Sequence, residues 1–215
     1  MRIVTVLQTR ALNALQRGSS EFTPAHVQAL ARQIEQYAPF ASFEVLSDVN
    51  VPGIKSIRPF EDYPGWWQKM SLFDPRFPGD FLFMDLDTVV VGPLDDILAV
   101  KKLTLLRDWY RDGKKLKEGL GGGLIYLPAD ARKEVWSMWR QQPQLNMKVY
   151  ARGDQFLMER FYLNTADRWQ DVVPGQVASW KVTCKNGVVP PETRLITFHG
   201  NPRPWATSPF LHLYR

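Results

Sequence analysis

The chain has 215 residues, of which 45% are hydrophobic and 13% aromatic, so it can bury a sizeable core and wholesale disorder is excluded. Its 27 Lys and Arg residues outnumber its 22 Asp and Glu residues, which gives a net charge of +5. A single cysteine, Cys184, excludes an internal disulfide and a cysteine-rich zinc site, and no apolar run reaches the roughly 18 residues of a membrane span.

The net positive charge of the chain comes from its second half. Residues 1–100 carry 8 basic and 12 acidic side chains, whereas residues 101–215 carry 19 basic and 10 acidic ones. This asymmetry favours an anionic partner. No linker divides the sequence, so we expect a single domain over residues 1–215. The lone thiol is typical of a reducing compartment, and we expect a cytoplasmic protein without membrane insertion.

The first half of the chain predicts strands that alternate with helices. An apolar run at 3–7 is too short for the core of a signal peptide and predicts a buried strand. Thr23 and Pro24 are typical of a helix start, and apolar residues follow at helical spacing. Further strands are predicted at 43–46, 54–57, 81–84 and 88–91, and a short helix at 66–73.

The second half continues the same alternation. Strands are predicted at 103–106, 124–127, 177–182 and 195–198, and helices at 129–140 and 154–162. The pattern predicts an α/β fold whose central sheet is mainly parallel and flanked by helices.

Two carboxylates follow the most apolar predicted strand. The continuous run Phe81–Met84 predicts a central strand buried on both faces, and Asp85 and Asp87 come directly after it. Residues two apart on a strand point the same way, about 7 Å apart, and ligands of open α/β sheets bind where strands end. At that distance two carboxylates repel by about 2.5 kcal/mol, which a Mg²⁺ or Mn²⁺ ion would offset. In the simpler alternative, the pair caps a turn before Thr88.

The segment from Phe83 to Val90 resembles the Asp-x-Asp segment of glycosyltransferases with the GT-A fold. It is closest to retaining family 8, which includes glycogenin and bacterial galactosyltransferases. Four further segments follow the family's order between about residues 3 and 205: Lys69, sixteen residues before Asp85; Gly121–Gly123 at a strand start; Gly153-Asp154-Gln155; and His199-Gly200-Asn201-Pro202-Arg203-Pro204-Trp205.

This resemblance implies a single GT-A (Rossmann-like) domain that transfers a hexose from a nucleotide sugar to an acceptor hydroxyl with retention. The implied donor is a uridine diphosphate (UDP) hexose, and the implied cofactor is Mn²⁺ or Mg²⁺. Asp154 and Gln155 would face the reacting sugar as catalytic residues. The metal ligands would be Asp85, Asp87 and His199. The donor-binding residues would be Leu7, Lys69, Asp85, Gly122, Gly123, Gly200 and Arg203.

Three departures from the family pattern are visible. His199 adjoins Gly200, whereas the family separates the corresponding residues by two positions. Arg203 replaces a lysine and keeps the charge. Glycine stands where the family has the asparagine of its Asn-Ser/Thr-Gly motif, which leaves the sugar preference open.

A basic cluster in the second half leaves an alternative function open. Such a run is usually a solvated face, but it can also bind an anionic acceptor or nucleic acid. The alternatives are therefore a nucleic-acid-binding protein or a DNA-modifying glycosyltransferase, and the acceptor could be a glycan, a protein or DNA. The cluster consists of Lys101, Lys102, Arg107, Arg111, Lys114, Lys115 and Lys117.

A nucleotidyltransferase or nucleotide-sugar hydrolase would share the metal carboxylates. Such an enzyme should carry a Gly- and Lys/Arg-rich phosphate loop after the first strand. The segment Leu7-Gln8-Thr9-Arg10 does not match that description.

Overall fold

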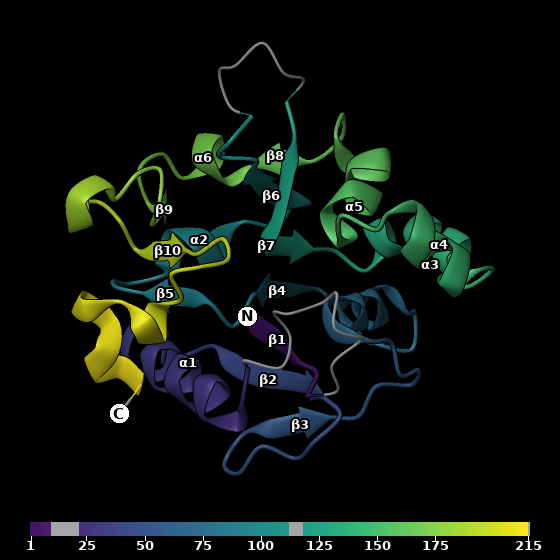
Figure 1. Ribbon diagram of the computed structural model, residues 1–215, viewed down its shortest axis with the longest axis horizontal. Coiled ribbons are helices and arrows are strands. Elements are labelled where there is room, and N and C mark those ends of the chain that lie inside the picture. The colour runs from purple at the N-terminus through teal and green to yellow at the C-terminus, as the bar shows by residue number, and fades with distance from the viewer. Residues whose placement is uncertain (10–21, 112–117, 215) are drawn as a thin grey trace.

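The computed structural model describes residues 1–9, 22–111 and 118–214, and its centre is a seven-stranded sheet (Figure 1). The strand order is β3-β2-β1-β4-β7-β6-β8. Strand β7 is antiparallel to both of its neighbours, and the other four pairings are parallel. This confirms the predicted α/β fold with a mainly parallel sheet. The strands are β1 (Arg2–Leu7), β2 (Ser42–Ser47), β3 (Lys55–Ile57), β4 (Phe81–Met84), β6 (Thr104–Arg107), β7 (Leu120–Leu127) and β8 (Asp167–Arg168).

Hydrophobic clusters cover both faces of this sheet. Along β4, Leu82 and Met84 join the cluster that includes the apolar face of helix α1 (Pro24–Tyr37). Phe81 and Phe83 point the other way, into a second cluster. All four residues are at most 1% exposed, which confirms a central strand buried on both faces. The second cluster includes residues of the 3₁₀ helix η2 (Gly65–Phe73) and of helices α3 (Lys133–Trp139) and α5 (Asp154–Tyr162).

A second, three-stranded sheet was not predicted from the sequence. Strand β10 (Leu195–Thr197) pairs antiparallel with β5 (Thr88–Val90) and parallel with β9 (Val177–Ser179). Thr88 of β5 and Thr197 of β10 are directly paired. This pairing brings the segment after Asp87 next to the segment before His199, which are 112 positions apart in the sequence.

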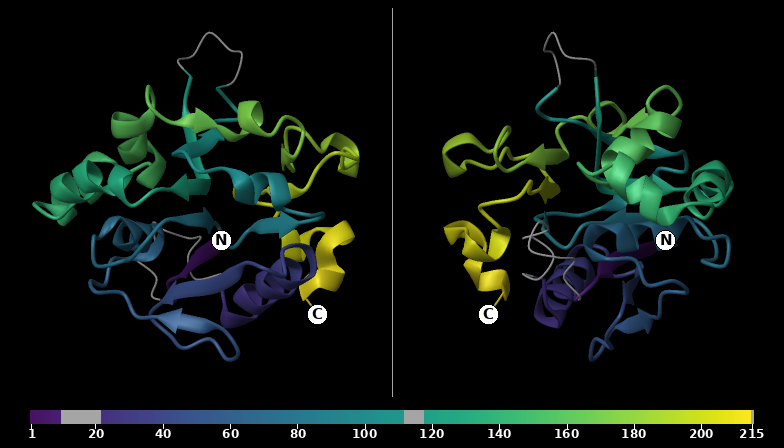
Figure 2. Two further views of the ribbon diagram at one scale, coloured as in Figure 1. Left: turned by 180° about the vertical axis from the view of Figure 1, so that it is seen from behind. Right: turned by 45° about the vertical axis from the view of Figure 1, so that its right-hand side comes forward.

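Helices occupy two sides of the molecule. Figure 1 shows α3, α5 and the short α4 (Pro143–Val149) gathered on one side of the sheet. Figure 2 shows the C-terminal segment beside α1, where Arg32 donates a hydrogen bond to the carbonyl of Leu213 (3.0 Å). The remaining short helices are α2 (Asp95–Ala99), α6 (Trp169–Val172) and the 3₁₀ turns Asp130–Arg132, Lys185–Gly187, Pro204–Ala206 and Ser208–Tyr214.

Several local details differ from the sequence-based expectation. The helix predicted at 66–73 is a 3₁₀ helix, and the one predicted at 129–140 is divided into a 3₁₀ turn and α3. Gly121–Gly123 lies inside β7 rather than ahead of it, where the pairing with β6 shifts register between Leu105 and Leu106. None of the helices in the described ranges is both long and apolar enough to cross a membrane.

Candidate active site

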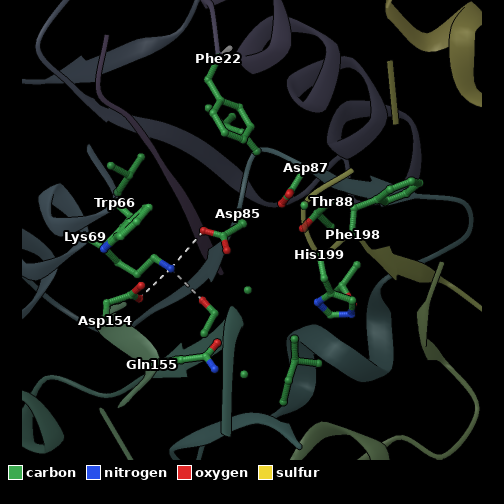
Figure 3. Close-up of a pocket in the computed structure, with 18 of the residues that line it drawn as sticks. Phe22, Trp66, Lys69, Asp85, Asp87, Thr88, Asp154, Gln155, Phe198 and His199 are labelled. Atoms are coloured by element: carbon green, nitrogen blue, oxygen red, sulfur yellow. Dashed lines mark hydrogen bonds and ion pairs between the residues drawn. The ribbon is translucent and has the colours of Figure 1, made fainter. Parts of the chain in front are cut away.

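A pocket of about 400 Å³ opens where the parallel strands β1 and β4 end (Figure 3). Its wall is built by the ends of β1 and β10, the turn after β4, the start of β7, helix η2 and the first turn of α5. This is the edge of an α/β sheet at which ligands bind. The residues that line it are Val6, Gln8, Phe22, Gly65, Trp66, Lys69, Asp85, Leu86, Asp87, Thr88, Leu106, Gly121, Gly122, Gly123, Arg152, Asp154, Gln155, Thr197, Phe198, His199, Gly200 and Arg203.

Asp85 and Asp87 flank a turn rather than lying on one extended strand. The backbone N–H of Thr88 donates to the carbonyl of Asp85 (3.1 Å), and the N–H of Asp85 donates to the carbonyl of Gly123 on β7 (2.9 Å). The alternation argument therefore gives the wrong local geometry. A turn forms before Thr88, as the simpler alternative expected, but the two carboxylates pair with Lys69 and Arg203 rather than capping it. Both carboxylates nevertheless line the pocket.

Lys69 holds two carboxylates from different elements. Its ammonium lies 3.2 Å from Oδ1 of Asp85 and 2.9 Å from Oδ2 of Asp154, and it donates to the carbonyl of Gly122 (3.1 Å). The side chain is 6% exposed. Burial alone would lower the pKa of Lys69, but the charges of Asp154 and Asp85 outweigh it and raise that pKa above its usual range. Lys69 is therefore a fixed cation at the floor of the pocket.

Gly122 permits this arrangement because it has no side chain. A Cβ atom there would lie 2.7 Å from Cε of Met158, 3.2 Å from Oδ2 of Asp154 and 3.5 Å from Nζ of Lys69. The glycine thus lets α5 and Lys69 approach β7 closely. Gly123 is less crowded, with its nearest neighbour, Oδ2 of Asp85, at 3.4 Å from such a Cβ.

Asp87 and Arg203 form an ion pair at the other side of the pocket. Burial and the charge of Asp85 raise the pKa of Asp87 to about 7, against the opposing effect of Arg203. Burial also raises the pKa of Asp85, with Lys69 opposing it and the charge of Asp154 adding to it. For both carboxylates, burial makes the ionised form costly, and the neighbouring cations do not fully offset that cost.

Two carboxylates of this kind fit a hard divalent cation, which prefers oxygen ligands and supplies the missing positive charge. His199 does not join them. Its Nε2 lies 3.0 Å from Oγ of Ser179 on β9, and its ring contacts Tyr110 edge-on at 5.8 Å between centroids. Burial, then the charge of Lys181, lowers the pKa of His199 to about 4, so the ring is neutral at pH 7.

The predicted three-residue metal site is therefore not assembled. Over residues 1–9, 22–111 and 118–214, no group of three His, Cys, Asp or Glu side chains is placed to hold a metal ion. The imidazole is instead engaged by Ser179, which lies 20 positions earlier in the sequence on β9.

Leu7 is a second correction. Its side chain is fully buried in the core beside α1, whereas its neighbours Val6 and Gln8 line the pocket. Alternation along β1 is the reason, because adjacent residues of a strand face opposite sides. The other proposed donor and catalytic residues, from Lys69 to Arg203, line the pocket as expected from their motifs.

Sequence reasoning missed several lining residues. Arg152 and Thr88 directly adjoin recognised motifs, and this adjacency was the available signal. The buried hydroxyl of Thr88 has no hydrogen-bond partner among the described residues. Phe22 comes from the segment before α1 and reaches the pocket near Arg203, whose guanidinium lies 5.0 Å from its ring centroid. Nothing in the local sequence of Phe22 indicates that position.

Two arginines of the predicted basic cluster are neutralised within the fold, whereas Lys101 and Lys102 are exposed. Arg107 pairs with Asp171 (2.5 Å), and Arg111 pairs with Asp108 (2.8 Å) and with Glu159 on α5. These arginines fasten strand β6 and its following turn to α5 and α6 rather than forming an open anionic site. Lys114, Lys115 and Lys117 lie outside the described residues.

Comparisons with known proteins give a fold but no family. No protein-family model matches the chain, and no curated protein matches its sequence. Among solved structures, the glycosyltransferase GlyE of Streptococcus pneumoniae TIGR4 is 11% identical with a TM-score of 0.69, over 99% of this chain and 60% of GlyE. The galactosyltransferase LgtC, in complex with donor and acceptor sugar analogues, is 13% identical with a TM-score of 0.64, over 100% of this chain and 95% of LgtC. The bifunctional glycosyltransferase WbbM is 13% identical with a TM-score of 0.66, over 100% of this chain and 48% of WbbM.

These matches show that the chain has the GT-A fold expected from its sequence, over its whole length. At such low identity the likeness extends to the fold alone. The chain spans 60% of the length of GlyE and 48% of the length of WbbM.

Proposed function

We propose that this chain, with its GT-A fold, is a metal-dependent glycosyltransferase. It would transfer a hexose from a nucleotide sugar, most simply a UDP-hexose, to an acceptor hydroxyl with retention of configuration. The observation that carries the proposal is the set of three carboxylates, and the two cations paired with them, in one pocket at the carboxyl ends of β1 and β4. The likeness to LgtC, a galactosyltransferase solved with donor and acceptor sugar analogues, supports it.

Asp85 and Asp87 would hold the divalent cation, Mn²⁺ or Mg²⁺. When bound, such a cation neutralises the negative charge that develops on the departing nucleoside diphosphate. The raised pKa values of both carboxylates support this role, because burial makes their ionised forms costly and a bound cation would stabilise those forms.

The chain's own residues would divide the remaining work. Arg203 would bind the diphosphate oxygens from the side of Asp87, and the backbone at Gly200 would let the phosphates approach closely. At the other side, Lys69 orients the carboxylate of Asp154 by a 2.9 Å ion pair, so that Asp154 can bind hydroxyls of the transferred sugar. Gln155, the next residue of α5, would face the anomeric carbon.

The nucleic-acid-binding alternative loses part of its support. It rested on unpaired positive charge in the second half of the chain, and the described arginines of that cluster are paired with carboxylates. DNA as an acceptor is a separate possibility that concerns only the second substrate of the proposed reaction.

A thermal-shift panel tests the proposed function. The purified protein is heated with UDP, UDP-glucose, UDP-galactose and other nucleotide sugars, each with Mn²⁺ and with chelator. A ligand at 100 times its dissociation constant stabilises the fold by about 2.7 kcal/mol, so we expect a metal-dependent rise of several degrees for one donor. D87N should remove this rise, whereas E35Q, an exposed change on α1, should retain it. The absence of a metal-dependent shift with every donor would overturn the proposal.

A further inference from the structure

Arg152 is a pocket cation that has no carboxylate partner among the described residues. Of the cations that line the pocket, Lys69 is engaged by Asp85 and Asp154, and Arg203 is engaged by Asp87. Arg152 is exposed, and within the described part of the chain no carboxylate forms an ion pair with its guanidinium. Because the chain neutralises its other pocket cations, a free guanidinium here is available to a ligand.

The position of Arg152 is fixed by its neighbours. It precedes Gly153, whose φ of +128° strains any other residue and places Arg152 just outside α5. Its guanidinium lies 4.7 Å from the ring centroid of Phe156, one turn into that helix. Arg111 lies against the same ring at 5.6 Å and is itself held by Glu159 and Asp108. The cation–π contact therefore holds Arg152 at the pocket wall without neutralising it.

Arg152 belongs to the sugar side of the pocket rather than to the diphosphate side. It lies two residues before Asp154, whose carboxylate contacts Lys69. Figure 3 shows Lys69, Asp154 and Gln155 together on one side of the pocket, with Asp87 and Thr88 on the other. A ligand group that reaches Arg152 therefore comes from the side where the acceptor would approach the transferred sugar.

An exposed aromatic side chain lies against the His199 side of the pocket. Tyr110 is 47% exposed and contacts the ring of the lining residue His199 at 5.8 Å between centroids. Tyrosine offers an apolar face with a polar end, which suits the mixed surface of a sugar ring.

We propose that the acceptor is an acidic sugar, whose carboxylate or phosphate is bound by the guanidinium of Arg152. Arginine presents parallel N–H groups that match both anions, so the contact would be bidentate. The identification of the bound sugar as the acceptor rests on the proposed function. The anion-binding role of Arg152 rests only on the contacts of this residue.

Direct binding of three simple sugars tests this role. The probes are D-glucuronate, D-glucose 6-phosphate and D-glucose, titrated by ligand-observed NMR against the free protein and against protein saturated with UDP and Mg²⁺. We expect at least one acidic sugar to bind about tenfold more tightly than glucose, the size of one charge-assisted hydrogen bond. Comparison of glucuronate with glucose 6-phosphate tells whether the site prefers a carboxylate or a phosphate. Binding should weaken in 0.5 M NaCl.

Variants distinguish Arg152 from general positive charge. R152Q should abolish the preference for the acidic sugar, and R152K should restore only part of it because lysine loses the bidentate geometry. The matched control R140Q removes an exposed arginine at the end of α3 and should keep the preference. The proposal is overturned if glucose binds as tightly as both acidic sugars, if none of the three binds, or if R152Q keeps the discrimination.

Failure of this inference can be told apart from failure of the proposed function. If UDP with metal gives no thermal shift but acidic sugars bind through Arg152, the anion site stands and the glycosyltransferase assignment falls. If UDP binds with metal but the acidic sugars show no advantage, the acceptor is neutral and only the present inference fails.

Discussion

Replacement of Lys69 by methionine should destabilise the protein in a pH-dependent way. The variant keeps most of the side-chain volume but removes the ammonium that lies 3.2 Å from Asp85 and 2.9 Å from Asp154. At an effective dielectric constant near 20, each ion pair has a gross Coulomb energy of about 5 kcal/mol. Part of this is offset because the buried ammonium no longer has to be desolvated. Breaking a buried pair from one side is typically worth about 3–5 kcal/mol, which we take as the expected loss at pH 8.

The pH dependence follows from the two carboxylates left behind. A buried carboxyl whose pKa is raised in the folded state destabilises the fold when it is ionised, and the penalty disappears as the pH falls through the raised pKa. Burial already raises the pKa of Asp85, and loss of Lys69 removes the main opposing charge. The deficit of K69M relative to wild type should therefore shrink between pH 8 and pH 5.

Urea unfolding at pH 8, 6.5 and 5 measures this difference. The double variant K69M/D154N should recover part of the stability at pH 8, because it removes one of the two unpaired charges. K102M, at an exposed lysine, is the matched control and should stay within about 0.5 kcal/mol of wild type. A loss below about 1 kcal/mol for K69M, or a loss that does not change with pH, would refute the electrostatic argument.

Two further substitutions test the same pocket. In chelator at pH 8, D87N should be at least as stable as wild type by thermal unfolding. Burial and the charge of Asp85 raise the pKa of Asp87 to about 7, so the ionised form of Asp87 opposes folding at pH 8. Any advantage of D87N should vanish at pH 5, and a D87N protein less stable than wild type at both pH values would contradict this. G122A should lose about 1 kcal/mol of stability and lower nucleotide-sugar turnover, because a Cβ would lie 3.2 Å from Oδ2 of Asp154 and would also displace the end of the Met158 side chain. G123A, with no contact under 3.4 Å, should unfold like wild type, and equal effects of the two changes would count against the close packing at Gly122.

The central sheet could be predicted because its signal is local. Phe81–Met84 is apolar at every position, and only a strand covered on both faces needs such a run. The helix start at Pro24 was equally local, since Thr23 and His26 form a capping box within four residues. Short-range chemistry of this kind is present in the sequence itself.

The parts that failed depend on contacts between distant segments. The second sheet depends on the pairing of β5 with β10, in which Thr88 lies opposite Thr197. The residue pattern of neither segment indicates which strand it pairs with. His199 followed the order of the family's motifs, but its imidazole is directed by Ser179 of a neighbouring strand. For the same reason Phe22 was missed, because its place in the pocket depends on how the segment before α1 packs near Arg203.

Different charged residues of the pocket would bind the proposed donor and the proposed acceptor. Three carboxylates face two engaged cations, and the neutral His199 adds nothing, so the donor end has one negative charge to spare. A nucleoside diphosphate sugar would add about two more, and such a charge cannot be buried without a divalent cation. Arg152 lies outside this group and is not needed to balance it. Its charge would be unmatched by a neutral acceptor and matched by an acidic one, which is why we propose that the acceptor carries an anionic group.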